Sequence, residues 1–181
     1  MVLFMACALK LKRIIVFWEK TMSSFEDITL REIESFDLEI FYAQQLDAEA
    51  NRMAAFVGKD PADRAAFDAR WAKILQAPEI INRTIVADGQ VAGHIACFPQ
   101  AGELEVTYWL GREFWGHGLA TQALEWMLLL VAERPIFARA ATDNLRSIRV
   151  LEKCGFKMIG TNRDFAQGRG EEIEETIFRL D

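Results

Sequence analysis

The sequence is poor in the residues that build disulfide frameworks and metal centres. Its 181 residues include three cysteines and two histidines. Cys7, Cys97 and Cys154 are odd in number and widely spaced, without a C-x-x-C pair, which argues against a disulfide framework or a zinc site. His94 and His117 are too isolated to predict a metal cluster. We therefore expect no metal site, and a protein that works in a reducing compartment, the cytoplasm.

The chain also lacks a long apolar run and an excess of positive charge. No stretch approaches the roughly 20 apolar residues of a membrane span. The formal net charge is −6, whereas sequence-independent binding of nucleic acid requires a basic surface. The hydrophobic fraction of 51% and the charged fraction of 27% are typical of a globular domain. The length favours one domain with a substantial core, and we expect neither nucleic acid nor a membrane as a partner.

The first 22 residues differ in character from the rest. An apolar run is followed by three basic residues and then by a second apolar run. A secretory signal would place its basic residues first and end in small residues at a cleavage site. Three interpretations remain open: an upstream extension with the working start at Met22, which we prefer, an additional strand or helix packed on the domain, or an amphipathic segment at a membrane surface. We expect residues 1–22 to be an extension and residues 23–181 to form a single domain.

Alternating and turn-forming residues predict a series of strands. Imperfect alternation over residues 28–33 predicts the first one. Asp88 and Gly89 form a strong two-residue hairpin signal, because glycine tolerates positive φ. The predicted strands cover residues 28–33, 83–87, 90–98, 104–110, 136–141, 156–159 and 171–180, with a polar loop at residues 160–170.

Apolar periodicity predicts the helices. Asp60 is a capping residue and Pro61 suits the first turn of the helix that follows, because its missing N–H would have no partner there. Asn144 is expected to cap another helix. The segment 119–133 is apolar nearly all round, so we expect a helix buried on most sides. The predicted helices cover residues 35–47, 60–78, 119–133 and 144–154, while residues 48–57 fit either a second short helix or a loop.

One stretch between a predicted strand and a predicted helix carries a ligand-binding signal. It reads EFWGHGLA at residues 113–120. A glycine turn ahead of a helix leaves backbone N–H groups without partners at the positive end of the helix dipole, and such groups suit a phosphate or a pyrophosphate. Gly116 and Gly118 remove side chains where an anion needs close approach to the backbone. Turns of this kind are common, so the loop alone also fits a simple change of chain direction.

Two further motifs make the pattern more specific. The chain carries E-x-x-Y-W-L at residues 105–110, W-G-x-G-x-A at residues 115–120 and N-x-x-S-x-x-x-L-E-K-x-G-F at residues 144–156. In this order and on these predicted elements, the motifs resemble the GNAT superfamily of acyl-CoA-dependent N-acetyltransferases over residues 28–181. They are most similar to the branch of ribosomal-protein N-terminal acetyltransferases, the Rim type. The resemblance implies an α/β (α+β) fold in which helices flank a central mixed, mostly antiparallel sheet.

The resemblance implies transfer of an acetyl group from acetyl-CoA to a primary amine, by direct attack in a ternary complex. An alkyl amine is mostly protonated at neutral pH, so a proton must leave before attack. Glu105 is the expected catalytic base, acting through water, and Glu103 is its competitor; a solvated strand glutamate is the other interpretation. Ser147 is the expected catalytic acid, because Leu151 stands where many members have a tyrosine; a helix serine bonded to a backbone carbonyl is the alternative. Backbone N–H groups of residues 108–110 would hold the oxyanion, as in the family.

The resemblance also implies a site for acetyl-CoA. Asn144 matches the asparagine that bonds the pantetheine arm, a role compatible with capping a helix. Arg149, Lys153 and Arg112 are candidates for the CoA phosphates, and each also fits a surface charge. Glu113 stands where the superfamily commonly has glutamine or arginine, which removes one positive contact to phosphate. The residues expected to bind acetyl-CoA are Leu110, Trp115, Gly116, His117, Gly118, Leu119, Ala120, Thr121, Asn144, Arg149 and Lys153.

The acceptor is the least determined part of the reaction. The resemblance places its pocket at residues 41–56, helped by the loop at residues 163–169. The expected substrate-binding residues are Asn51, Arg52, Met53 and Phe56. A protein N-terminus, a polyamine, an amino acid and an aminoglycoside all remain open, and we expect a monomer or a homodimer. The alternative to an enzyme is a non-catalytic acyl-CoA sensor, motivated by the missing tyrosine and by Glu113.

Overall fold

The computed structural model describes residue 25 and residues 27–181, so the predicted extension at residues 1–22 lies outside the described residues. The elements, in chain order, are β1 (Ile28–Arg31), α2 (Asp37–Gln45), α3 (Ala48–Ala54), α4 (Arg64–Gln76), β2 (Ile81–Ala87), β3 (Gln90–Gln100), β4 (Glu103–Leu110), the 3₁₀ turn η1 (Arg112–Phe114), α5 (Leu119–Leu130), β5 (Ile136–Ala141), α6 (Leu145–Lys153), β6 (Lys157–Ala166) and β7 (Glu171–Leu180). None of the described helices combines the length and the apolar character that crossing a membrane requires.

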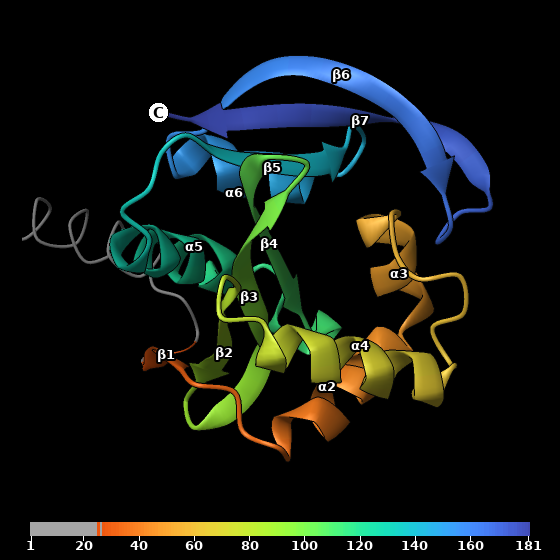
Figure 1. Cartoon of the computed structure of the whole chain (residues 1–181), viewed down its shortest axis with the longest axis vertical. Helices are drawn as coiled ribbons and strands as arrows, with labels where there is room; N and C mark the ends of the chain where they lie inside the picture. Colours follow the sequence, from red (N-terminus) through yellow and green to blue (C-terminus); the bar gives the residue numbers. More distant parts are fainter. Residues whose placement is uncertain (1–24, 26) are drawn as a thin grey trace, which may run out of the picture.

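The strands of the described residues form one seven-stranded sheet in the order β1-β2-β3-β4-β5-β7-β6 (Figure 1). β1 to β4 form an antiparallel meander, β4 pairs in parallel with β5, and β5, β7 and β6 pair antiparallel. Parallel neighbours need a long connection, and α5 lies within the one that joins β4 to β5. The sheet is mixed and mostly antiparallel with helices against it, which confirms the expected fold class.

Two tight turns build the meander. Asp88 and Gly89 join β2 to β3 with φ of 47° and 75°, and Ala101 and Gly102 join β3 to β4 with φ of 51° and 85°. Positive φ at both central residues fits the type I′ turn, whose twist matches that of the flanking strands. The hairpin predicted at Asp88 and Gly89 is confirmed.

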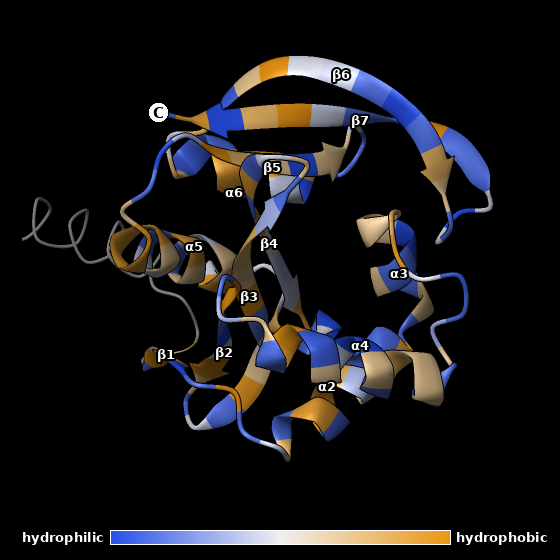
Figure 2. Ribbon diagram, viewed as in Figure 1, coloured by the Kyte–Doolittle hydropathy of each residue, from blue (hydrophilic) through white to orange (hydrophobic). Residues whose placement is uncertain are grey.

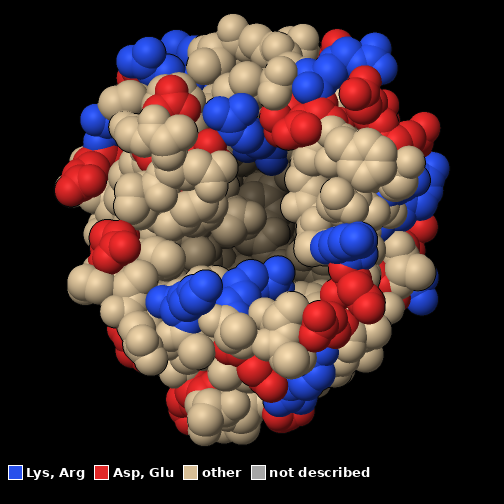
Figure 3. Space-filling view, turned by 45° about the vertical axis from the view of Figure 1, so that its right-hand side comes forward, with Lys and Arg blue, Asp and Glu red and all other residues tan. Residues whose placement is uncertain are grey.

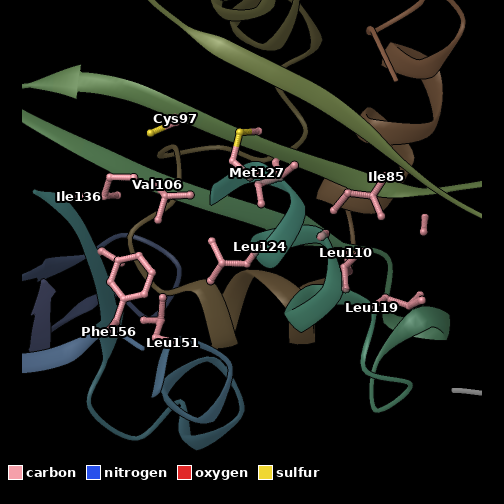
Figure 4. Close-up of a cluster of buried hydrophobic side chains, with 14 of the residues drawn as sticks. Ile85, Cys97, Val106, Leu110, Leu119, Leu124, Met127, Ile136, Leu151 and Phe156 are labelled. Carbon is pink, nitrogen blue, oxygen red and sulfur yellow. The ribbon is translucent and has the colours of Figure 1, made fainter. Parts of the chain in front are cut away.

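The main core lies between the sheet and helices α5 and α6. Leu124 and Met127 of α5 are fully buried and pack in one cluster with Val106 of β4 and Ile136 of β5 (Figure 4). The far side of α5 is open, because Leu129 is 84% exposed. The expectation that this helix is buried on most sides was therefore wrong for its last turn.

A smaller cluster covers the other face of the sheet. Phe41 of α2 packs with Phe67 and Trp71 of α4, and the His94 ring of β3 lies 4.8 Å from the Phe41 ring and 5.0 Å from the Trp71 ring. The next residue, Ile95, belongs to the main core. Because successive strand residues point to opposite faces, α2 and α4 lie on the face opposite α5.

A buried ion pair joins β1, α2 and β2. The carboxylate of Asp37 is fully buried. It accepts hydrogen bonds from the Arg31 guanidinium at 2.6 and 2.7 Å, from the Thr84 hydroxyl at 2.6 Å and from the N–H of Glu34 at 2.9 Å. Desolvation raises the pKa of Asp37, but these hydrogen bonds outweigh it and the pKa is lowered overall. The network fixes the start of α2 against the sheet.

The long helix before the hairpin begins later than predicted. It starts at Arg64, and its capping residue is Asp63, whose carboxylate accepts the N–H of Ala66. Asp60 instead accepts the N–H of Ala62 within the preceding turn. Both aspartates satisfy a backbone donor locally, so the sequence pattern alone does not distinguish the turn from the helix cap.

The loop predicted at residues 160–170 is also a correction, because β6 continues through Ala166 and pairs with β7 along its length. β6 is an edge strand, and its second half is hydrophilic (Figure 2). Edge strands tolerate polar residues on both faces, so the alternation that marks a half-buried strand is missing. The loop is confined to residues 167–170.

Candidate active site

A cavity of about 480 Å³ lies beside the carboxyl ends of β4 and β5. Its wall is formed by β4, the glycine loop, the first turn of α5, β5, α6 and the end of α3. Figure 3 shows a hollow in the middle of one face, with lysine and arginine side chains on its rim. Every residue expected to bind acetyl-CoA except His117 lines this cavity.

The cavity exists because β4 and β5 separate. Within the described residues, their ladder includes Leu104 and Glu105 of β4 and goes no further. Gly111 donates its N–H toward β3, and backbone groups alternate in direction along a strand. The N–H groups of Tyr108 and Leu110 are therefore directed to the β5 side, which at this level is the open cavity. Strand backbone of this kind can pair with an amide-containing ligand.

The glycine loop leads into α5 with its first N–H groups uncapped by a side chain. Gly116 and Gly118 have φ of 85° and 81°, in the left-handed region that glycine adopts most readily. Gly118 occupies the cap position and offers no side-chain acceptor, whereas α3, α4 and α6 are capped by Asp47, Asp63 and Asn144. The first residues of α5 line the cavity. Free N–H groups at the positive end of a helix dipole suit an anion there.

Asn144 makes two bonds within the protein and also lines the cavity. Its Oδ1 accepts the N–H of Ser147 at 3.1 Å and so caps α6, which confirms the capping role. Its Nδ2 donates to the carbonyl of Met53 in α3 at 3.0 Å. The amide has a second N–H proton. A contact from it to the pantetheine arm stays a prediction.

Helix α6 carries three basic residues on the cavity wall, Arg146, Arg149 and Lys153. Their spacing of i, i+3 and i+7 places them on one helix face. The Arg146 guanidinium lies over the Trp115 ring, 5.5 Å from its centroid. Sequence reasoning missed Arg146, although its spacing from the other two could have found it. Arg112 lies outside the lining and pairs with an aspartate at the start of α3, 3.2 Å away.

Two hydroxyl groups meet in the cavity wall. The Oη of Tyr108 in β4 lies 2.7 Å from the Oγ of Ser147 in α6 and 3.4 Å from the carbonyl oxygen of Ser147. Burial raises the pKa of Tyr108 to about 12, although the hydrogen bond with Ser147 acts in the opposite direction. The sequence predicted Ser147 at this site, and the structure brings Tyr108 to it as well.

Glu105, the expected base, lies outside the cavity lining. It is 6% exposed and faces the side of β4 opposite Tyr108. Its Oε1 accepts a hydrogen bond from Nε of Arg139 in β5 at 2.8 Å. Arg139 does line the cavity, and its guanidinium also lies 3.7 Å from Glu103 and 3.6 Å from Glu175. Glu105 is thus linked to the cavity through Arg139. Sequence reasoning missed Arg139, although it is the one charged residue in β5.

Of the expected acceptor residues, Met53 lines the cavity, and Asn51, Arg52 and Phe56 do not. Asn51 is buried, and its Nδ2 donates to two carbonyl groups around the end of α2 at 2.6 and 2.9 Å. This side chain therefore ties α3 to α2. Of the two structures that residues 48–57 allowed, the helix is observed, as α3.

The end of α3 is held by side chains from distant segments. The last four carbonyl groups of a helix have no partner within it. The carbonyl of Arg52 accepts from Nε of Arg169 at 2.9 Å, and that of Met53 accepts from Asn144. Arg169 also forms a bidentate pair with Asp143, at 2.7 and 2.8 Å. The end of α3, the turn between β6 and β7, and the start of α6 therefore form one hydrogen-bonded unit at the edge of the cavity.

The histidines lie away from the cavity lining. Burial lowers the pKa of His94 to about 3, and the charge of Arg70 acts in the same direction, so this side chain is neutral at physiological pH. The His117 ring lies nearly perpendicular to the Phe25 ring, with centroids 5.2 Å apart. In the described part of the chain, no group of histidine, cysteine, aspartate and glutamate side chains is arranged to hold a metal ion.

Comparison with known sequences adds a family and one curated relative. The sequence profile of the Acetyltransferase (GNAT) domain matches residues 27–157. The relative, Uncharacterized N-acetyltransferase p20 of Bacillus licheniformis, is 30% identical over 83 residues, which are 44% of this chain and 47% of the relative. The chain thus spans about half the length of the curated relative that it matches.

Solved structures share the fold. Mycobacterium smegmatis RimJ in complex with CoA-disulfide superposes with a TM-score of 0.70 and 18% identity, over 84% of this chain and 81% of that chain. Spermidine N-acetyltransferase from Vibrio cholerae in complex with CoA and spermine superposes with a TM-score of 0.70 and 16% identity, over 84% of this chain and 95% of that chain. At these identities the likeness is one of fold.

Proposed function

We propose that this chain, which belongs to the GNAT family of acetyltransferases, transfers an acetyl group from acetyl-CoA to a primary amine. The observation that carries the proposal is the cavity where β4 and β5 separate. Open strand backbone, the start of α5 and three basic residues of α6 share its wall. An elongated ligand with an amide arm and phosphate groups needs such groups. We also propose that residues 23–181 form the catalytic domain and that residues 1–22 are an extension of it.

In this proposal acetyl-CoA lies along the cavity wall. The pantetheine amides pair with the open edge of β4 near Leu110, and Asn144 donates to the same arm. The pyrophosphate lies at the glycine loop and the first turn of α5, at residues 115–121. Arg149 and Lys153, joined by Arg146, meet the CoA phosphates. Opposite charge and a helix dipole act together there, so affinity should fall as salt rises.

The reaction is a direct attack by the amine nitrogen on the thioester carbonyl. Glu105 accepts a proton from the amine through water, and Arg139 orients this carboxylate. The strand N–H group of Tyr108 stabilises the oxyanion that forms at the carbonyl oxygen, and the N–H group of Leu110 is left for the pantetheine arm. When the C–S bond breaks, its electron pair goes to sulfur and Ser147 contributes to the protonation of the thiolate. The products are the acetylated amine and free CoA.

The acceptor is an amine that enters beside α3, where Met53 lines the cavity. A small-molecule amine and a protein N-terminus are both retained as acceptors. A polyamine is supported by the structural neighbour solved with spermine, and a protein N-terminus by the likeness to RimJ. Both probes belong in the first screen.

The proposal is tested first by binding and then by turnover. A ligand present at about 100 times its dissociation constant stabilises a protein by roughly 2.7 kcal/mol, which for this length raises the melting temperature by about 5–10 °C. We expect that shift with acetyl-CoA and not with ATP or NAD. Turnover is followed as free thiol released from acetyl-CoA with spermidine or with a short peptide that has a free amino terminus.

Two matched variants examine the base. Glu105→Gln keeps the acceptor oxygen for Arg139 and removes the proton acceptor, so we expect turnover to fall about 10²–10⁴-fold with acetyl-CoA binding retained. Glu103→Gln is the control, because this glutamate lies on the same strand near the same arginine but is 41% exposed. Equal turnover of the two variants would contradict the assignment of Glu105.

A non-catalytic acyl-CoA sensor is the second candidate function. The observation that favours it is the position of Glu105, which is held by Arg139 and lies outside the cavity lining. A sensor would show the acetyl-CoA melting shift with no thiol release above background for any amine in a broad panel. Turnover that depends on Glu105 excludes it.

A further inference from the structure

We propose that Tyr108 is a catalytic residue that acts with Ser147 as a hydroxyl pair to protonate the leaving sulfur of CoA. This inference rests on the proposed acetyl transfer. Helix α6 has Leu151 at the position where the resembled family often has a tyrosine, and that leucine is buried in the main core. The tyrosine hydroxyl of this chain reaches the cavity from the facing strand instead.

The geometry places the pair at the cavity rather than within the core. Tyr108 and Ser147 both line the cavity, one from β4 and the other from α6. Their oxygens are 2.7 Å apart, the distance of a strong O–H···O bond. Two hydroxyl groups carry two protons, and their mutual bond uses one of them. Whichever oxygen donates in that bond, the other proton can be directed to a group bound between the strand and the helix.

The surroundings keep the proton on the pair. The Tyr108 ring packs against the main core, which limits its access to solvent, and burial raises its pKa to about 12. Cys154, the titratable group whose charge acts on the phenol, has a pKa raised to about 11 by burial, so it too stays neutral near physiological pH. Of the basic residues that line the cavity, Arg146, Arg149 and Lys153 lie on the exposed face of α6, and Arg139 is paired with Glu105. The phenol is therefore protonated when acetyl-CoA arrives.

The step balances in atoms and charge. As the tetrahedral adduct collapses, the C–S bond breaks and its electron pair goes to sulfur. The free proton of the pair moves to that sulfur and gives the CoA thiol, while the remaining proton is shared between the oxygens of Tyr108 and Ser147. An ammonium acceptor gives up two protons: the one that leaves before attack goes to bulk water, and the one that the nitrogen loses after attack passes through Glu105 and water and restores the second hydroxyl. Over one turnover no proton is gained or lost by the protein.

The test compares CoA with desulfo-CoA, in which hydrogen replaces the thiol, by isothermal titration calorimetry at pH 9. A thiol with a pKa near 8.5–10 is partly ionised there, and a hydroxyl donor at the sulfur favours the thiolate. We expect the wild type to prefer CoA by about 5-fold or more, and the Tyr108→Phe variant to bind the two ligands equally. Tyr42→Phe is the control, since this tyrosine lies on α2 and bonds the Ala62 carbonyl. It should keep the wild-type preference.

Turnover provides the second measurement. We expect Tyr108→Phe to lower kcat at least 10-fold at unchanged KM for acetyl-CoA. Because the pair acts as a unit, the double variant Tyr108→Phe/Ser147→Ala should have a kcat no lower than that of the slower single variant. The role of Tyr108 is overturned if the wild type binds CoA and desulfo-CoA equally, or if the preference for CoA survives in Tyr108→Phe. Either result leaves the proposed acetyl transfer standing. Failure of every protein to bind CoA overturns the proposed function, and with it this inference.

Discussion

Replacing Arg169 by alanine tests whether α3 is held in place from outside. The Arg169 side chain is only 8% exposed. It donates to the carbonyl of Arg52 through Nε and to both carboxylate oxygens of Asp143. Alanine removes all three hydrogen bonds and leaves the Arg52 carbonyl without its donor at the end of a short helix.

The expected loss of stability in Arg169→Ala is the sum of three contributions. The Asp143 side chain is 63% exposed, so its pair with Arg169 contributes about 0.5–1 kcal/mol, as surface pairs do. The hydrogen bond to the Arg52 carbonyl contributes about 1 kcal/mol. Burial of the aliphatic stem of Arg169 adds about 1 kcal/mol. Together they amount to about 2.5–3 kcal/mol, which lowers the melting temperature of a chain of this size by about 5–12 °C.

The assay is thermal unfolding followed by circular dichroism, with Arg163→Ala as the matched control. Arg163 lies on β6 near the same turn but is exposed, so its loss should cost less than about 0.5 kcal/mol. Because α3 is bonded to Asn144 at the cavity edge, we also expect Arg169→Ala to weaken acetyl-CoA binding and Arg163→Ala to leave it unchanged. Equal melting temperatures for the two variants would refute the reasoning.

Three further predictions concern the buried carboxylate, the phenol and the loop. Asp37→Asn should cost about 3 kcal/mol in unfolding at pH 7. Because the folded-state pKa of Asp37 is lowered, the wild-type advantage should hold above about pH 4 and shrink as the pH falls through that lowered value. An advantage that stays constant as the pH is lowered contradicts the reasoning. The chain has two tyrosines, so the alkaline absorbance of the wild type minus that of Tyr108→Phe isolates one phenol, which should be mostly protonated at pH 11 because its pKa is about 12. Gly118→Ala and Gly102→Ala place alanine at φ of 81° and 85°, with no atom within 4 Å of the new Cβ. Thermal melting should show a similar stability cost of about 1 kcal/mol for both variants. Calorimetry should show weaker acetyl-CoA binding for Gly118→Ala and unchanged binding for Gly102→Ala.

Local chemistry made much of the fold predictable. The hairpin at Asp88 and Gly89 needs positive φ in two successive residues, and few dipeptides adopt it as readily. The helix capped by Asn144 combines a cap, an apolar face and a glycine at its end within twelve residues. The glycine loop could be located for the same reason, since an anion site at a helix start is built from consecutive residues. In each case the cause and the result lie in one segment.

The contacts that sequence reasoning missed join side chains that are far apart in the sequence. Tyr108 and Ser147 are 39 residues apart, and Glu105 and Arg139 are 34 apart. Periodicity shows which face of a strand or helix a side chain occupies, but it does not identify the side chain opposite. For that reason the strand predicted at residues 136–141 contains Arg139, but the sequence gives this arginine no role. The second half of β6 was missed for a different reason, because an edge strand with polar residues on both faces lacks the alternation that marks a half-buried strand.

The separation of β4 from β5 also has a consequence for how the chain folds. Short turns join β2 to β3, β3 to β4 and β6 to β7, so little chain entropy is lost in closing these connections. The seam between β4 and β5 joins the two halves of the sheet through a ladder that ends at Glu105 within the described residues. We expect this seam to form late and to open first, with its amides exchanging in deuterium oxide faster than those of either half. A molecule bound across the gap would span both halves, so acetyl-CoA should slow exchange at the seam more than anywhere else in the sheet.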